Sequence, residues 1–177
     1  MENIQDYYKK ILKGQDLSLP EKKSWELILE NNKNNEDSIA YSEDERKIYY
    51  GQLEDEFKKY AKALTSLGIT KENNSRILPL TPNLIEAGLL NNAADITGAV
   101  VDFVDPTSKI ETLKQYIVNE KATDIVVLDL IYIKELKKYT EELKKDYGIR
   151  NIILFDNLLA NTILPKHMQK AMRLFQS

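Results

Sequence analysis

Apolar residues between positions 51 and 69 recur at steps of three and four, the spacing that places side chains on one face of an α-helix. The stretch GQLEDEFKKYAKALTSLGI carries them among charged residues, and Gly68 stands where a left-handed residue would end the helix. The pattern predicts one amphipathic helix with its apolar face against a core. The apolar positions are Leu53, Phe57, Tyr60, Ala61, Leu64 and Leu67.

Downstream of this helix, short apolar runs alternate with helical patterns at intervals of roughly 25 residues. This alternation is typical of right-handed strand–helix–strand units and therefore of a parallel sheet. Proline donates no hydrogen bond to a neighbouring strand, so Pro79 is expected at a sheet edge or a bulge. Pro82 suits the first turn of the helix that follows. The predicted strands are residues 75–80, 98–104, 124–130 and 151–155, and the predicted helices are residues 82–97, 108–120 and 132–148.

The segments around this alternating region have patterns of their own. Residues 38–50 contain two short apolar runs around an acidic turn, which predicts a hairpin. Short amphipathic helices are predicted near the N-terminus and at the C-terminal end, within residues 1–14, 21–31 and 165–177. We therefore expect an α/β fold with a parallel or mixed sheet and flanking helices, preceded by a hairpin and a short helical lead. The expected divisions are 1–37, 38–156 and 157–177, the last as the start of a truncated connecting segment.

Composition and charge narrow the classes of function. The 25 basic and 28 acidic residues alternate along the chain, so no basic surface for nucleic acid is expected. No apolar run approaches the roughly 20 residues of a membrane span, and the charged first residues do not resemble a signal peptide, so we expect a cytoplasmic protein. With no cysteine and a single histidine, His167, a thiolate metal site and a metal site built from several histidines are excluded within this chain. We expect no catalytic residue and no metal site here.

Four groups of residues stand at fixed intervals across residues 50–106. They are Tyr50 with Leu53; Ala61, Leu64 and Leu67 with Gly68; Pro82 and Asn83 with Glu86; and Gly98, Ala99 and Asp105 with Pro106. In this order and spacing they resemble the N-terminal part of the AMP-forming ligases. That superfamily covers acyl- and aryl-CoA synthetases, the adenylation domains of nonribosomal peptide synthetases, and luciferases. The resemblance covers residues 38–156, and the loop at residues 70–75, Pro79 and Asp102 depart from the family pattern.

The resemblance implies a two-step reaction in a full-length parent enzyme. ATP and Mg²⁺ activate a carboxylic acid as an acyl-adenylate with release of pyrophosphate, and the acyl group then passes to the thiol of CoA or of a carrier protein. The ATP site of this family contains a loop rich in Gly, Ser and Thr whose backbone N–H groups hold phosphate. No stretch of this chain resembles that loop, and the chain therefore resembles an N-terminal fragment that is expected to be inactive alone and to hold no cofactor. Its implied partners are the rest of the same polypeptide, a small carboxylic acid and CoA. The six glycines of the chain are dispersed, so they form no glycine-rich loop. They are Gly14, Gly51, Gly68, Gly88, Gly98 and Gly148.

The segment after the predicted strand 98–104 holds the candidate binding residues. Asp105 and Pro106 are predicted to end the strand and turn the chain. In family members that use CoA, this segment lies near the nucleotide end of CoA. The resemblance therefore makes Thr107, Ser108 and Lys109 candidate CoA-side residues, with Lys109 as a charge for a phosphate.

Two other functions remain open from the sequence. The chain fits a stand-alone, non-catalytic binding or scaffold protein, and it fits a fragment of an amino-acid-activating adenylation domain. A flavodoxin-like or dinucleotide-binding domain is disfavoured because no predicted strand leads into a glycine-rich phosphate turn.

Overall fold

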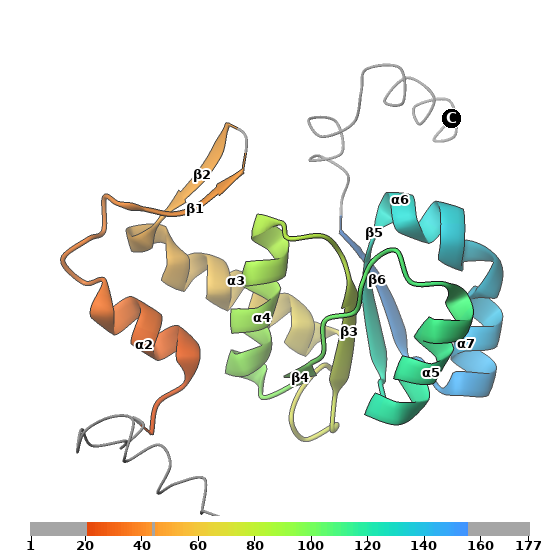
Figure 1. Cartoon of the computed structure of the whole chain (residues 1–177). Helices are drawn as coiled ribbons and strands as arrows, with labels where there is room; N and C mark the ends of the chain where they lie inside the picture. The colour runs from red at the N-terminus through yellow and green to blue at the C-terminus, as the bar shows by residue number, and fades with distance from the viewer. Residues whose placement is uncertain (1–20, 44, 156–177) are drawn as a thin grey trace, which may run out of the picture.

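A sheet of four parallel strands forms the centre of the protein (Figure 1). The structure is a computed structural model, and it describes residues 21–43 and 45–155. The spatial order of the strands is β4-β3-β5-β6, so the chain passes from β4 across β3 to reach β5. This arrangement confirms the predicted α/β fold. The strands are β3 (Arg76–Leu80), β4 (Val100–Val101), β5 (Asp124–Leu128) and β6 (Asn151–Phe155).

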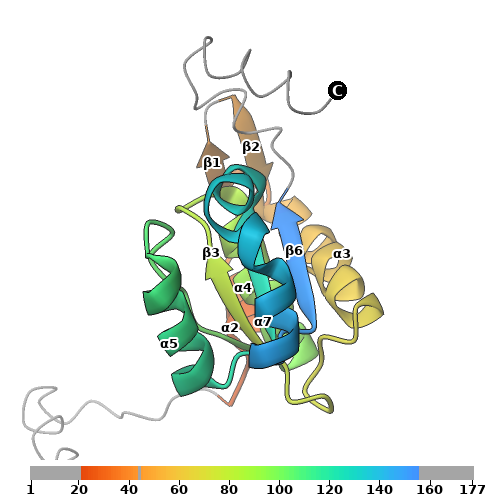
Figure 2. The same cartoon turned by 90° about the vertical axis from the view of Figure 1, so that its right-hand side faces the viewer.

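Helices cover both faces of the sheet, as Figures 1 and 2 show. The helices α3 (Leu53–Ser66) and α4 (Ile85–Thr97) pack on one face, and α5 (Ile110–Glu120) and α7 (Thr140–Tyr147) pack on the other. Successive residues of a strand point to opposite faces, so Val126 contacts the α3/α4 layer while Ile125 and Val127 contact the α5/α7 layer. Burial on both sides explains why these strands are continuous apolar runs in the sequence.

The predicted helix 132–148 is interrupted in the structure. It consists of the π-helical turn η2 (Tyr132–Leu136), the 3₁₀ turn η3 (Lys137–Tyr139) and α7. The short helix α6 (Asp129–Ile131) precedes it, so β5 ends at Leu128 and not at residue 130 as predicted. Gly148 follows α7 with a φ of 71°, the left-handed conformation that glycine adopts without steric cost. Gly68 has a φ of 74° after α3, as predicted for the end of that helix.

A two-stranded hairpin and a short helix precede α3. The predicted hairpin is confirmed as β1 (Ile39–Glu43) paired antiparallel with β2 (Arg46–Tyr49), followed by the 3₁₀ turn η1 (Tyr50–Gln52). The helix α2 (Ser24–Asn31) lies against α4, where the backbone N–H and the hydroxyl of Ser24 donate to Asp95 Oδ2 at 3.0 and 2.8 Å. The predicted helices 1–14 and 165–177 and the residue His167 lie outside the described residues.

Pro79 lies in a central strand, so the prediction of a sheet edge or a bulge is wrong. Its carbonyl accepts a hydrogen bond from the Val104 N–H at 3.1 Å, and its ring nitrogen therefore faces the segment after β4. The Asp102 N–H donates to Ile77 O at 3.0 Å, but position 79 has no N–H to donate in return. Regular pairing is consequently limited to β4 (Val100–Val101) and does not span the predicted strand 98–104.

Pro82 does not belong to the first turn of α4, which corrects a second prediction. The helix begins at Ile85, with Leu84 at the N-cap in an extended conformation. A distant carboxylate determines this start, because Glu43 Oε2 accepts the Ile85 N–H at 2.9 Å. Pro82 is instead part of the turn that leads out of β3.

The amino ends of three strands meet in a polar cluster around Asp124. This aspartate is fully buried, and its carboxylate accepts hydrogen bonds from Arg150 Nη2 at 2.8 Å, Asn151 Nδ2 at 2.6 Å and Thr123 Oγ1 at 2.6 Å. Arg150 also donates to Ser75 Oγ at 2.8 Å, which brings in the residue before β3. The cluster therefore joins the starts of β3, β5 and β6.

Replacement of Asp124 by alanine should lower the free energy of unfolding by about 3 kcal/mol, because Arg150 and Asn151 would lose their buried acceptor. The control is Asp102→Ala. Asp102 also pairs with an arginine, Arg76 at 3.4 Å, but both side chains are about one-third exposed, and the expected loss is below about 1 kcal/mol. Urea unfolding of the two variants measures both values, and equal losses would contradict the importance assigned to burial.

Candidate functional site

The carboxyl ends of the strands form the edge of the sheet at which a ligand site is expected. The chain leaves β3 and β4 toward opposite faces, through α4 on one side and α5 on the other. In open α/β sheets, ligands bind outside the carboxyl ends of strands at such a change of direction. The amino ends carry the Asp124 cluster, so the two edges of the sheet differ in character.

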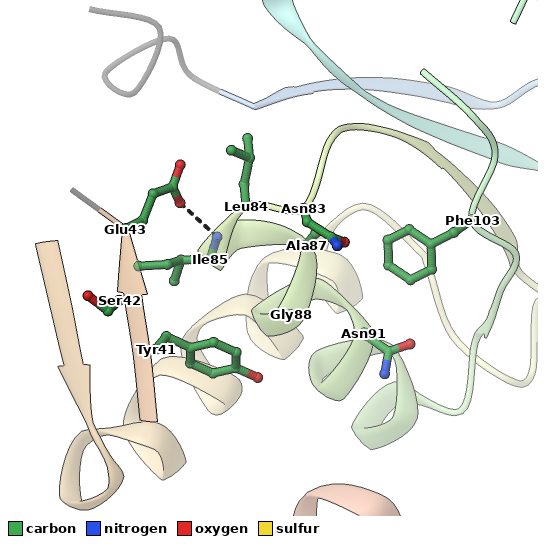
Figure 3. A pocket seen from close by; sticks show the side chains of 10 residues that line it. All are labelled: Tyr41, Ser42, Glu43, Asn83, Leu84, Ile85, Ala87, Gly88, Asn91 and Phe103. Carbon is green, nitrogen blue, oxygen red and sulfur yellow. Dashed lines mark hydrogen bonds between the residues drawn. The ribbon is translucent and has the colours of Figure 1, made fainter. Parts of the chain in front are cut away.

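A hollow of about 460 Å³ opens beside this edge, between the hairpin and the first turns of α4. Figure 3 shows Tyr41 on the hairpin side, Phe103 on the opposite side, and α4 between them. Its volume lies in the range of small-molecule sites, and it combines apolar walls with a few polar groups. The lining residues are Tyr41, Ser42, Glu43, Asn83, Leu84, Ile85, Ala87, Gly88, Asn91 and Phe103.

Glu43 connects the hairpin to the amino end of α4. One carboxylate oxygen accepts the Ile85 N–H, and the other oxygen is buried without a hydrogen-bond partner among the described residues. The amino end of a helix attracts anions because its N–H groups are unpaired and its dipole is positive there. Since Glu43 already occupies this position, the hollow is not a phosphate site.

A second contact between the hairpin and α4 depends on the absence of a side chain at Gly88. A Cβ atom at this position would lie 2.7 Å from Cε1 of Tyr41. The Asn92 side chain donates to Gly88 O at 2.9 Å and lies 3.5 Å from the Tyr41 hydroxyl. Burial raises the pKa of Tyr41, so its ring forms a neutral wall of the hollow.

Three residues of the spaced groups between Tyr50 and Pro106 have structural roles around α4. Glu86 pairs with Arg46 of β2 and forms a third link between hairpin and helix. Asn83 lines the hollow from the turn before α4. Gly98 follows α4 with a φ of 73°, which a residue with a side chain rarely adopts.

The candidate CoA-side residues lie together on a loop at the same edge, but they do not line the hollow. Asp105 Oδ1 accepts the N–H of Thr107 at 2.8 Å and its hydroxyl at 2.7 Å, which closes a tight turn as expected for Asp105 and Pro106. These hydrogen bonds, that from the hydroxyl foremost, hold the pKa of Asp105 below its usual range. Ser108 donates its N–H to Asp105 O at 3.0 Å, and the exposed Lys109 is the N-cap of α5.

Sequence reasoning missed Glu43, Tyr41 and Phe103 as residues of one site. Glu43 and Ile85 are 42 positions apart, and no local pattern indicates that they meet. Within the residues that the structure describes, no group of three possible metal ligands is found. Across the same residues, no helix has both the length and the apolar character of a membrane span.

A family model described as AMP-binding enzyme matches residues 28–171, which is most of the chain. The protein belongs to the AMP-binding enzyme family. This confirms the resemblance seen in the spaced residues from Tyr50 to Pro106. A search of curated proteins found no match.

Solved structures of the family share the fold of this AMP-binding enzyme chain. The N-terminal domain of FACL13 from Mycobacterium tuberculosis has a TM-score of 0.68 at 18% identity, covering 78% of this chain and 35% of that one. A benzoate CoA ligase from Burkholderia xenovorans LB400 has a TM-score of 0.64 at 16% identity, covering 77% and 26%. A luciferase-like enzyme from the mealworm Zophobas morio has a TM-score of 0.64 at 18% identity, covering 85% and 36%. The chain thus spans about a quarter to a third of the length of these relatives.

Gly88→Ala tests the contact that shapes the hollow. Alanine favours a helix over glycine by about 1 kcal/mol, but its methyl group would overlap the Tyr41 ring, so we expect a net loss of about 1–2 kcal/mol in the free energy of unfolding. In a Tyr41→Ala background the overlap is absent, and the same substitution should stabilise the protein by about 0.5–1 kcal/mol. Denaturant unfolding of the four proteins measures this reversal of sign. A loss of equal size in both backgrounds would show that the ring does not require glycine.

Proposed function

We propose that this chain is the N-terminal part of an ATP-dependent, AMP-forming carboxylate–CoA ligase. In the first step the carboxylate of the substrate attacks the α-phosphate of ATP, forming an acyl-adenylate and releasing pyrophosphate. In the second step the thiol of CoA attacks the acyl carbon and AMP leaves. Membership of the AMP-binding enzyme family over residues 28–171 carries this proposal. The similarity to structures described as CoA ligases supports the choice of CoA as acceptor.

ATP and Mg²⁺ would be held outside the part of the enzyme described here. The 177 residues contain no loop rich in Gly, Ser and Thr, and Glu43 fills the amino end of α4 where a phosphate could otherwise bind. The residues present therefore do not fit the triphosphate. We infer that this chain forms one wall of the site, that a longer polypeptide supplies the remainder, and that the chain alone does not turn over substrate.

Exposed apolar side chains at the carboxyl edge support packing against such a remainder. Phe103 is 52% exposed, Ile133 is 48% exposed and Leu154 is 45% exposed. They come from the segment after β4, the turn after β5 and the end of β6 respectively. Apolar side chains are also exposed elsewhere, among them Val118 at 63% and Leu67 at 45%, so the carboxyl edge is one of several surfaces suited to contact with another domain.

The loop at Thr107, Ser108 and Lys109 is the proposed contact for the nucleotide end of CoA. Thr107 is held by Asp105, so the loop has a defined shape before any ligand arrives. Lys109 is exposed at the amino end of α5, where its ammonium group and the helix dipole both favour a phosphate. Its side chain would contribute charge and orientation rather than chemistry.

The full-length gene product should catalyse ATP–pyrophosphate exchange that depends on a carboxylic acid. A panel of aliphatic, aromatic and amino acids identifies the acid. Formation of an acyl-CoA thioester identifies CoA as the acceptor. Exchange with amino acids and transfer to a carrier protein would favour an adenylation domain instead. Absence of exchange with every acid, in a protein that is folded, would favour the non-catalytic binding protein.

Lys109→Ala in the full-length enzyme should raise KM for CoA about three- to tenfold and leave acid-dependent pyrophosphate exchange unchanged. The reason is that one charge-assisted phosphate contact is lost while the first step does not involve CoA. Lys62→Ala, which removes an exposed lysine of α3, is the matched control and should change neither value. A change in exchange without a change in KM for CoA would place Lys109 elsewhere in the site.

A further inference from the structure

The hollow between the hairpin and α4 has a charge that the proposed reaction does not use. Among the described residues that line it, Glu43 alone carries a charge, and no lysine or arginine contributes to its walls. One oxygen of Glu43 accepts the Ile85 N–H, and the other is buried and has no hydrogen-bond partner among the residues that the structure describes. Arg46, which lies opposite Glu43 in the hairpin, is paired with Glu86, so the described walls of the hollow carry one carboxylate and no cation.

The shape of the hollow adds a preference for a flat molecule. Tyr41 and Phe103 flank it on opposite sides, while Ala87 and Gly88 of α4 leave a floor without bulky side chains (Figure 3). Aromatic rings attract cations through the negative face of the ring and also stack on planar groups. The side-chain amides of Asn83 and Asn91 add hydrogen-bonding groups at the rim.

We propose that this hollow binds a small planar organic cation of the amidinium class. The cation would be attracted by Glu43 and would lie beside the rings of Tyr41 and Phe103. The preference is opposite in sign to that of every substrate in the proposed ligase reaction, since carboxylates, ATP and CoA are all anions. The hollow would thus be a separate recognition site, and its assignment does not depend on the ligase proposal.

Three isosteric probes separate charge from shape in the test. Benzamidine is a cation at neutral pH, benzamide is neutral and benzoate is an anion, and the three have nearly the same planar frame. Titration of the ¹⁵N-labelled 177-residue chain should give saturable amide shifts at Gly88 and Asn91, with benzamidine binding tightest and benzoate weakest. Butylammonium, a cation without a ring, should bind more weakly than benzamidine because it cannot stack on Tyr41 or Phe103.

Two variants then identify the groups responsible. Glu43→Gln removes the charge but keeps an oxygen for the Ile85 N–H, so benzamidine should bind about fivefold more weakly and no better than benzamide. Phe103→Ala, at a position that is 52% exposed, should weaken the binding of benzamidine and of benzamide without altering the fold. Glu111→Gln removes an exposed carboxylate from the first turn of α5 and should change neither affinity.

Several outcomes would overturn the proposal. These are an absence of benzamidine binding, equal binding of benzoate, shifts that map away from α4, or unchanged affinity in Glu43→Gln. The measurement contains no ATP, acid substrate or CoA. A failed exchange assay therefore leaves it intact, and failure of the titration leaves the ligase proposal intact.

Discussion

The hydrogen bond from the Ile85 N–H to the Glu43 carboxylate at 2.9 Å determines how the two parts of this protein fit together. It sets the first residue of α4 and thereby the length of the turn that leaves β3. It also fixes the hairpin over the carboxyl edge of the sheet, beside the Glu86–Arg46 pair and the close contact of Tyr41 with Gly88. These three links add to the packing of Ile48 against Phe57 and Leu89, and a two-stranded hairpin is only marginally stable without such packing.

The two ends of the sheet have different physical roles. At the amino ends, the buried carboxylate of Asp124 gathers donors from Arg150, Asn151 and Thr123, and this polar cluster aligns the three strands. At the carboxyl ends, apolar side chains such as Phe103 remain exposed and the loops are turned outward. The amino edge thus carries the buried polar cluster, while the carboxyl edge carries the hollow and exposed apolar side chains. This separation is common in α/β enzymes, where loops carry function on a rigid sheet.

The start of α4 leaves no room for a phosphate among the described residues. A phosphate needs a cluster of free N–H groups, and the amino end of α4 is already occupied by Glu43. Apart from that position, the described residues present two surfaces at the carboxyl edge of the sheet. One surface is the loop closed by Asp105 and Thr107, and the other is the negatively charged hollow. They lie at the same edge of the sheet but differ in charge, since the exposed Lys109 follows the first and Glu43 lines the second.

Local patterns in the sequence determined most of the elements of this protein. Periodic apolar residues identified α3 and its terminal Gly68, and alternating strand and helix patterns identified the parallel sheet, because both reflect burial within a few turns of chain. Tertiary structure alone decided the position of Pro79, the short β4 and the hollow. Each depends on contacts between residues far apart in the sequence. Val104 contacts Pro79 and accounts for its position and for the short β4, while the hollow depends on the contacts of Tyr41 with Gly88 and of Glu43 with the start of α4. The periodicity of a segment reports which face is buried, but it carries no information about which distant residue is buried against it.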